Sequence, residues 1–103
     1  MPARSIGLAV VRGRSMQPTL RDGDRLLVVH GARPRVGGLV VVRLPDGVVA
    51  VKRAVRREPG GWWVERDNPT EGVDSRVVGV VAERNVVARV LCRAWPLPGW
   101  MRS

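Results

Sequence analysis

Residues 39–65, LVVVRLPDGVVAVKRAVRREPGGWWVE, contain three runs rich in β-branched and aromatic residues, divided by two turn sequences. Pro45-Asp46-Gly47 and Pro59-Gly60-Gly61 favour turns because proline fixes φ and glycine accepts a positive φ. Valine suits a pleated, half-buried surface. The stretch therefore predicts a meander of three strands, at Leu39–Leu44, Val48–Arg56 and Trp62–Glu65.

The same alternating pattern continues on both sides of this meander. It predicts four further strands, at Leu8–Arg12, Arg25–His30, Val77–Val81 and Val86–Ala94. Valine dominates the apolar residues, and phenylalanine and tyrosine are absent. The predicted fold class is all-β, with few or no stable helices.

Two stretches interrupt the alternation. Residues 13–20, GRSMQPTL, are predicted to form one helical turn with Ser15 at its N-terminus. Residues 66–76 are polar and include Pro69 and Gly72, which indicates a loop.

The 103 residues are about what one ordinary domain needs, so we expect a single domain over residues 1–103, with a Pro- and Trp-rich tail at 95–103. The uncharged apolar stretches are far shorter than the ~20 residues of a membrane-spanning helix, and the N-terminal residues lack the pattern of a secretory signal. We therefore expect no transmembrane anchor and residence in the cytoplasm. Trp95 and Trp100 of the tail are expected to pack on the domain's own sheet, with docking on a membrane or a substrate as the alternative.

The chain has one cysteine, Cys92, and one histidine, His30. A single cysteine excludes an intramolecular disulfide, and the two residues cannot assemble a Cys/His metal site, so no metal and no cofactor are predicted. We expect Cys92 to be a small buried hydrophobe and His30 to be a surface residue at the end of a strand.

The formal net charge of +9 would attract nucleic acid, a membrane surface or an acidic substrate alike. The basic residues are spread along the chain, and no aromatic residues are interleaved with them for base stacking. We therefore expect no specific nucleic-acid partner.

Lys52 is the only lysine among the 18 basic residues; the others are arginines, which cannot accept a proton near neutral pH. On the predicted strand its side chain shares a face with those of Val48, Ala50 and Ala54. Burial among small apolar groups disfavours the ammonium form. Lys52 is therefore a candidate general base, with a chance surface lysine as the alternative.

Nucleophilic catalysis needs a hydroxyl or thiol beside a base. Ser15 follows Gly13-Arg14 at a predicted transition from strand to turn, where backbone N–H groups near its Oγ can face a carbonyl. Ser15 is therefore a candidate nucleophile. The alternative is that it only caps the turn.

Three ordered segments resemble the conserved boxes of the signal peptidase I family. Residues 11–20, followed by Gly23-Asp24, resemble its nucleophile box, and residues 51–55 (VKRAV) resemble its lysine box. Asp67-Asn68, Asp74-Ser75-Arg76 and Gly79 resemble its third box.

This resemblance implies a serine endopeptidase with an all-β fold around an extended peptide groove. Ser15 would attack the scissile carbonyl, and Lys52 would take the hydroxyl proton and return it to the leaving amine. The backbone N–H of Ser15 would serve the oxyanion.

The resemblance also implies supporting roles within the boxes. Asp74 and Arg76 would pair, and Arg53 would help to hold the lysine strand. The remaining oxyanion or supporting candidates, which lie in the matching boxes, are Gly13, Met16 and Ser75.

The chain departs from the family pattern at three glycines. Some members place a hydroxyl at the position of Gly13, many place a serine that orients the lysine at Gly72, and an aspartate is common at Gly38. The difference at Gly72 leaves open what orients Lys52.

Within the family, Trp62-Trp63 ahead of the third box and Asp67-Asn68-Pro69 inside it resemble the subgroup that removes the propeptide of nickel superoxide dismutase in the cytoplasm. The implied partner is a protein substrate, the N-terminal propeptide of that enzyme. Two alternatives are a self-cleaving Ser-Lys peptidase core like that of SOS repressors and a non-catalytic module that binds peptides by strand addition.

Overall fold

The computed structural model describes residues 4–97 as seven antiparallel strands, one helical turn and one short 3-10 helix. The strands are β1 Ser5–Val10, β2 Arg25–His30, β3 Leu39–Arg43, β4 Val49–Glu58, β5 Gly61–Glu65, β6 Val81–Ala82 and β7 Val86–Trp95. The helical elements are α1 Ser75–Val78 and the 3-10 helix η1 Glu83–Asn85. All seven strands belong to one sheet, in the order β1-β2-β7-β3-β4-β5-β6. The predicted all-β fold class is confirmed.

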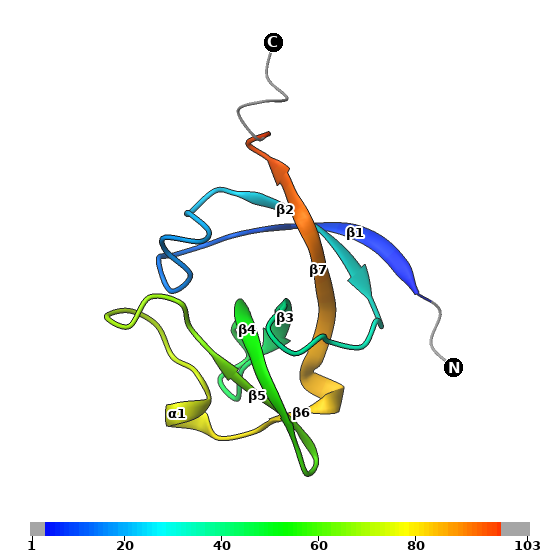
Figure 1. Cartoon of the computed structure of the whole chain (residues 1–103), viewed down its shortest axis with the longest axis vertical. Helices are drawn as coiled ribbons and strands as arrows, with labels where there is room; N and C mark the ends of the chain where they lie inside the picture. The colour runs from blue at the N-terminus through cyan, green and yellow to red at the C-terminus, as the bar shows by residue number, and fades with distance from the viewer. Residues whose placement is uncertain (1–3, 98–103) are drawn as a thin grey trace.

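The ten-residue strand β7 joins the two halves of the sheet. Its C-terminal part pairs with β2 and its N-terminal part with β3. In Figure 1, β7 therefore runs from the half that contains β3 to β6 up to the half that contains β1 and β2. The predicted meander of residues 39–65 is present as β3, β4 and β5, each antiparallel to the next.

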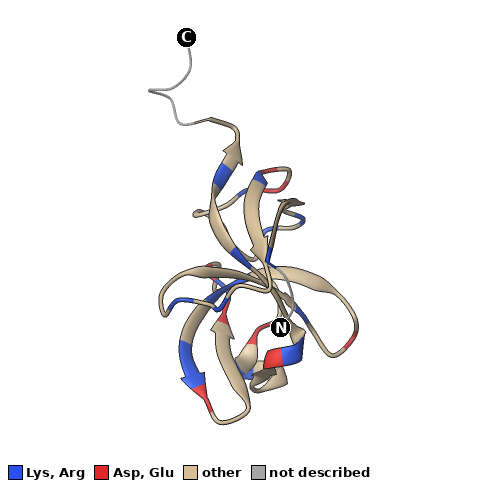
Figure 2. Cartoon of the chain, turned by 90° about the vertical axis from the view of Figure 1, so that its right-hand side faces the viewer, with Lys and Arg blue, Asp and Glu red and all other residues tan. Residues whose placement is uncertain are grey.

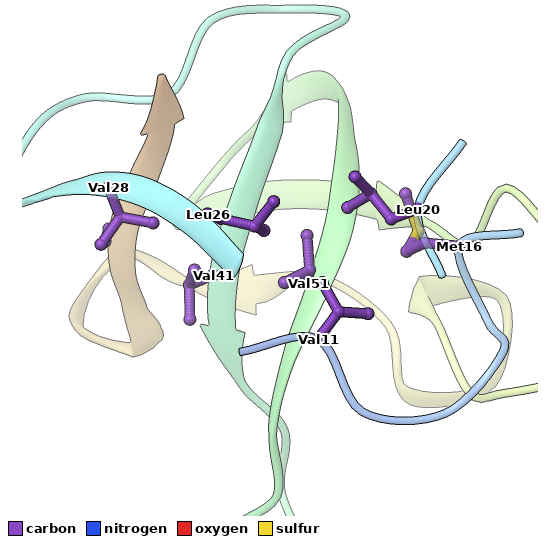
Figure 3. Close-up of a cluster of buried hydrophobic side chains, with 8 residues drawn as sticks. Val11, Met16, Leu20, Leu26, Val28, Val41 and Val51 are labelled. Atoms are coloured by element: carbon purple, nitrogen blue, oxygen red, sulfur yellow. The ribbon is translucent and has the colours of Figure 1, made fainter. Parts of the chain in front are cut away.

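The buried side chains form two apolar clusters, one for each half. The first joins the irregular segment of residues 11–20 to the strands and is drawn in Figure 3; its members are Val11, Met16, Leu20, Leu26, Val28, Val41, Val51 and Ala88. The second, which lies between β3, β4, β5 and β6, contains Val40, Val42, Leu44, Ala54, Trp62, Val64 and Val81. The alternation along β3 and β4 thus sends neighbouring side chains into different clusters.

The predicted strand at Val77–Val81 is wrong. Residues 75–78 form the helical turn α1, and only Val81–Ala82 pairs as a strand, with β5. The Asp74 side chain accepts a hydrogen bond from the Arg76 N–H and so caps the turn, and Gly79 ends it with a φ of +80°. Local capping outweighs the β propensity of the valines here.

Three other details differ from the prediction. The first strand is Ser5–Val10 rather than Leu8–Arg12. Trp95, assigned to the tail, is the last residue of β7 and is exposed, while residues 98–103, with Trp100, lie outside the described residues. Cys92 is exposed rather than buried, as are Leu91 and Arg93 beside it, because this part of β7 lies outside both apolar clusters. His30 is exposed at the end of β2, as predicted.

Residues 13–20 form consecutive turns rather than an α-helix. The Gln17 N–H donates to the Arg14 carbonyl at 3.1 Å, and the Leu20 N–H donates to the Met16 carbonyl at 2.8 Å. Met16 and Leu20 are buried in the first cluster. This segment, which we call the nucleophile turn (residues 13–20) after the role predicted for Ser15, is therefore fixed by its own apolar side chains.

The basic residues are distributed over strands and loops rather than gathered on one element, as Figure 2 shows. Within residues 4–97, no helix is long and apolar enough to cross a membrane.

Candidate active site

Lys52 lies in the middle of β4, opposite Val40 of β3, and is only 2% exposed. Desolvation by this burial lowers the pKa of its amine below the ordinary value of 10.5. The charge of Asp74 opposes the shift, and the charge of Arg66 adds to it. The β4 strand thus holds an amine in surroundings that favour its neutral form.

Ser15 meets this amine from the nucleophile turn. Lys52 Nζ donates a hydrogen bond to Ser15 Oγ at 3.0 Å, across 37 residues of sequence. In the neutral amine, the nitrogen lone pair can accept the hydroxyl proton over the same distance. The geometry is therefore that of a hydroxyl beside a base.

The loop of residues 66–68 holds the nucleophile turn in place. The Asn68 N–H donates to the Ser15 carbonyl at 2.8 Å, and Asn68 Nδ2 donates to the Arg14 carbonyl at 2.9 Å. The Asp67 N–H is 3.4 Å from Met16 Sδ. Met16, a supporting candidate from the sequence, is thus a buried anchor of the turn.

Gly13 begins the turn with a φ of +83°. Its N–H donates to Asp22 Oδ1 at 2.8 Å. This bond links the beginning and the end of the segment between β1 and β2.

Arg53 links β4 to the same loop. Its Nε and Nη2 bind the two carboxylate oxygens of Asp67 at 3.1 and 2.6 Å, and its Nη1 donates to the Gly37 carbonyl at 2.8 Å. The hydrogen bonds from Arg53, the bond from Thr19 and the Arg53 charge lower the pKa of Asp67 against the opposing effect of desolvation. Arg53 therefore connects β4 to the loop that holds the nucleophile turn in place. The sequence did not predict its partner, Asp67.

Asp74 is completely buried and organises the end of the third box. Desolvation raises its pKa, but hydrogen bonds from the Arg66 N–H, the Arg76 guanidinium and the Arg76 N–H together lower it by more, to below its ordinary value. The pairing of Asp74 with Arg76 that the resemblance implies is present, at 3.1 Å.

Ser75 is 1% exposed, and its Oγ accepts a hydrogen bond from the Val64 N–H at 2.9 Å. It thus ties α1 to β5. Ser75 and Arg76 contact neither Ser15 nor Lys52 through any hydrogen bond found in residues 4–97, so their support passes through Asp74 and β5.

Gly72 forms a wall of the site. A Cβ at this position would lie 2.4 Å from Ser15 Cβ and 3.4 Å from both Lys52 Nζ and Ser15 Oγ, and the φ of Gly72 is +95°. A serine here, which the family resemblance leads one to expect, would collide with Ser15. There is therefore no space for a side chain at residue 72, and the glycine backbone itself borders Ser15 and Lys52.

Two hollows meet at Ser15. A small one of about 70 Å³ has mainly apolar walls, among them Val11, Val41, Val49 and Ala50. A larger one of about 310 Å³ adjoins Lys52 and Gly72 and is also lined by the charged residues Arg12, Arg14, Asp46 and Glu71. Arg12, Ser15 and Ala50 line both hollows, which therefore adjoin at Ser15, and we refer to the two together as the groove.

This groove, with a hydroxyl and a buried amine at its centre on an all-β frame, is the candidate active site. The chain belongs to the Peptidase S24-like family, which matches it over residues 2–91. The match covers the nucleophile turn, β4 and the third box.

Two similar proteins are mitochondrial inner membrane protease subunits 1. The protein from Schizosaccharomyces pombe is 30% identical over an alignment of 117 positions, gaps included, that covers 88% of this chain and 74% of that protein. The protein from Xenopus tropicalis is 28% identical over an alignment of 116 positions that covers 87% of this chain and 70% of that protein. The signal peptidase I-like character expected from the sequence is therefore confirmed at the level of family.

Proposed function

We propose that this peptidase is a serine endopeptidase that works by a Ser-Lys dyad, with Ser15 as nucleophile and Lys52 as general base. The observation that carries the proposal is the 3.0 Å contact between Lys52 Nζ and Ser15 Oγ, made by an amine that is 2% exposed. A surface lysine would be protonated and unable to accept a proton, whereas burial favours the neutral amine.

In the first half of the reaction, Lys52 Nζ accepts the Ser15 hydroxyl proton as Oγ attacks the scissile carbonyl carbon. The oxyanion forms beside the backbone N–H of Ser15, and the C–N bond then breaks as the Lys52 ammonium returns the proton to the leaving amine. In the second half, Lys52 takes a proton from water, the hydroxide attacks the acyl-enzyme, and Ser15 Oγ recovers the proton as it leaves.

The groove supports a protein substrate bound in extended form. The small apolar hollow beside Ser15 suits a short side chain next to the scissile bond, because its volume of about 70 Å³ leaves no room for an aromatic ring. A peptide library should therefore favour small residues at this position, and a preference for aromatic residues would contradict the assignment.

For the physiological substrate, we propose the N-terminal propeptide of nickel superoxide dismutase, removed in the cytoplasm. The support is the resemblance of Trp62-Trp63 and Asp67-Asn68-Pro69 to that subgroup. The test is incubation of the purified precursor with this protein and measurement of the product masses. A single cut that exposes the mature N-terminus is expected; an uncut precursor beside a chain that cleaves other peptides would refute this substrate alone.

The dyad itself is tested by Ser15→Ala and by a fluorophosphonate probe. The wild type should be phosphonylated once, on Ser15 with fluoride as the leaving group, and should cleave peptides, while Ser15→Ala should do neither and should keep its circular dichroism spectrum. The matched control is Ser5→Ala, since Ser5 is an exposed residue of β1. Labelling that persists in Ser15→Ala would move the nucleophile elsewhere, and a folded wild type that is neither labelled nor active would favour a non-catalytic peptide-binding module.

A further inference from the structure

Arg66 immediately follows β5 and makes two carbonyl contacts with the loop that closes the site. Its Nη2 donates to the Pro69 carbonyl at 2.8 Å, and its Nη1 donates to the Gly72 carbonyl. Its backbone N–H donates to Asp74 Oδ2 at 3.0 Å. One residue thus binds the loop of residues 69–72 at both ends and the capping carboxylate just beyond it.

This loop needs an external constraint. Gly72 has a φ of +95° and lies so close to Ser15 that even a methyl group would not fit between them. Thr70 bonds to Asn68 near the base of the loop, whereas the carbonyl of Gly72, the residue that touches the dyad, is bound by Arg66. Without the guanidinium, the Gly72 carbonyl would lose this donor, and the loop would be held by the Thr70–Asn68 bond and the exposed Arg14–Glu71 ion pair.

The guanidinium also brings a permanent positive charge near the Lys52 amine, because arginine stays protonated at all relevant pH values. Asp74 is the opposing charge, and it is already bound by Arg76 and by the Arg66 N–H. The other charged groups around the larger hollow are Arg12, Arg14, Asp46 and Glu71. Of these, Arg14 pairs with Glu71 at 3.6 Å.

We infer that Arg66 is a positioning residue of the site, which fixes the 69–72 loop as the wall against which Ser15 and Lys52 meet and places a fixed positive charge near the Lys52 amine. The inference rests on the proposed dyad and adds to it a residue outside the three boxes. Its guanidinium Nε is buried without a hydrogen-bond partner in the described chain, so the side chain is held by its terminal nitrogens alone.

The test compares Arg66→Gln, Arg66→Lys and the control Arg84→Gln, which removes the same charge from the exposed 3-10 helix η1. Because Lys52 is the only lysine, ¹³Cε-lysine labelling gives a single NMR signal whose titration reports this amine directly, without any substrate. Arg66→Gln should raise the pKa of Lys52, should shift the rising limb of the pH–rate profile to higher pH, and should lower kcat/KM by ~10- to 100-fold through the lost carbonyl bonds. Arg84→Gln should behave as the wild type does.

Arg66→Lys separates the two effects, because it keeps the charge but cannot bind two carbonyls as a planar fork. It should restore the midpoint of the pH–rate profile while kcat stays reduced. If the Lys52 titration in Arg66→Gln coincides with that in Arg84→Gln, or if kcat/KM is unchanged, the inference is overturned. It is also overturned if Arg66→Gln and Arg66→Lys both lose only thermal stability. Failure of the proposed Ser-Lys dyad itself would be seen separately, because the wild type would then be inactive and would not be labelled by reagents that react with Ser15.

Discussion

The backbone of Gly72 touches the side chain of Ser15, since a Cβ on residue 72 would lie 2.4 Å from Ser15 Cβ. This contact leaves no room for the serine that the family resemblance places at this position. The lysine is instead confined between its strand, Ser15 and this backbone wall.

Gly72→Ala should therefore reduce activity sharply. The methyl group must displace Ser15 or the loop, and the backbone at a φ of +95° is also strained for alanine. We expect kcat/KM to fall by about 100-fold or more, because displacements of an ångström in a catalytic pair have effects of this size. Gly60→Ala is the matched control: its φ is +85°, but nothing lies within 4 Å of the added Cβ, so it should lose stability and not activity. Equal kinetic constants for the two variants would contradict the claim that a side chain at residue 72 displaces Ser15.

Lys52→Arg should lose activity by several orders of magnitude although the positive charge is kept, because guanidinium cannot act as a base near neutral pH. In the wild type, cleavage should rise with pH as the amine loses its proton, with a midpoint below 10.5, since burial lowers the pKa of Lys52. Initial rates on a peptide substrate measure both effects. Substantial activity in Lys52→Arg, or a rate without any ionisation between neutral and alkaline pH, would exclude Lys52 as the base.

Lys52→Met should stabilise the protein at neutral pH. The folded state binds the lysine proton more weakly than the unfolded chain does, so Lys52 destabilises the fold below its folded-state pKa, and this loss is relieved as pH rises toward 10.5. The gain should be on the order of 1–2 kcal/mol near pH 7, as for other strained functional residues, and should shrink at alkaline pH. Urea unfolding of both proteins across this range is the measurement. A constant difference between them would argue against the shifted pKa.

The pair of Arg53 and Asp67 should behave as a coupled unit. Each single change, Arg53→Gln or Asp67→Asn, should destabilise the fold by ~1–2 kcal/mol, and the double variant should lose less than the sum, because a two-pronged contact disappears only once. The pKa of Asp67 is lowered, so its contribution is complete above the ordinary value of 3.8 and is lost as pH falls through the folded-state pKa. Unfolding free energies at neutral and acid pH test both statements, and additive effects would refute the coupling.

Ser75→Ala should act on stability rather than on chemistry. It leaves the buried Val64 N–H without its acceptor, an effect of ~1–3 kcal/mol. Below the unfolding temperature, kcat/KM should stay close to the wild-type value. Val77→Ala, on the same helical turn but 71% exposed, should change the melting temperature little. A large loss of kcat in folded Ser75→Ala would give this residue a more direct role.

The sequence by itself determined the all-β fold class, the central meander and the surroundings of Lys52. Alternation is a local property, so the meander of residues 39–65 and the apolar neighbours Ala50 and Ala54 followed from spacing alone. The ordered boxes then predicted that Ser15 and Lys52 belong to one site, and in the structure Lys52 Nζ lies 3.0 Å from Ser15 Oγ.

Only the tertiary structure decided what surrounds that pair and which faces are covered. Residues 75–78 became a helical turn because the Asp74 carboxylate caps it, and Cys92 stayed exposed because residues 91–93 of β7 lie outside both apolar clusters. The spacing of residues in the sequence also does not predict that Gly72 touches Ser15 or that Arg66 binds the carbonyls of residues 69 and 72. Such contacts depend on where the chain returns after tens of residues, and periodicity carries no information about that path.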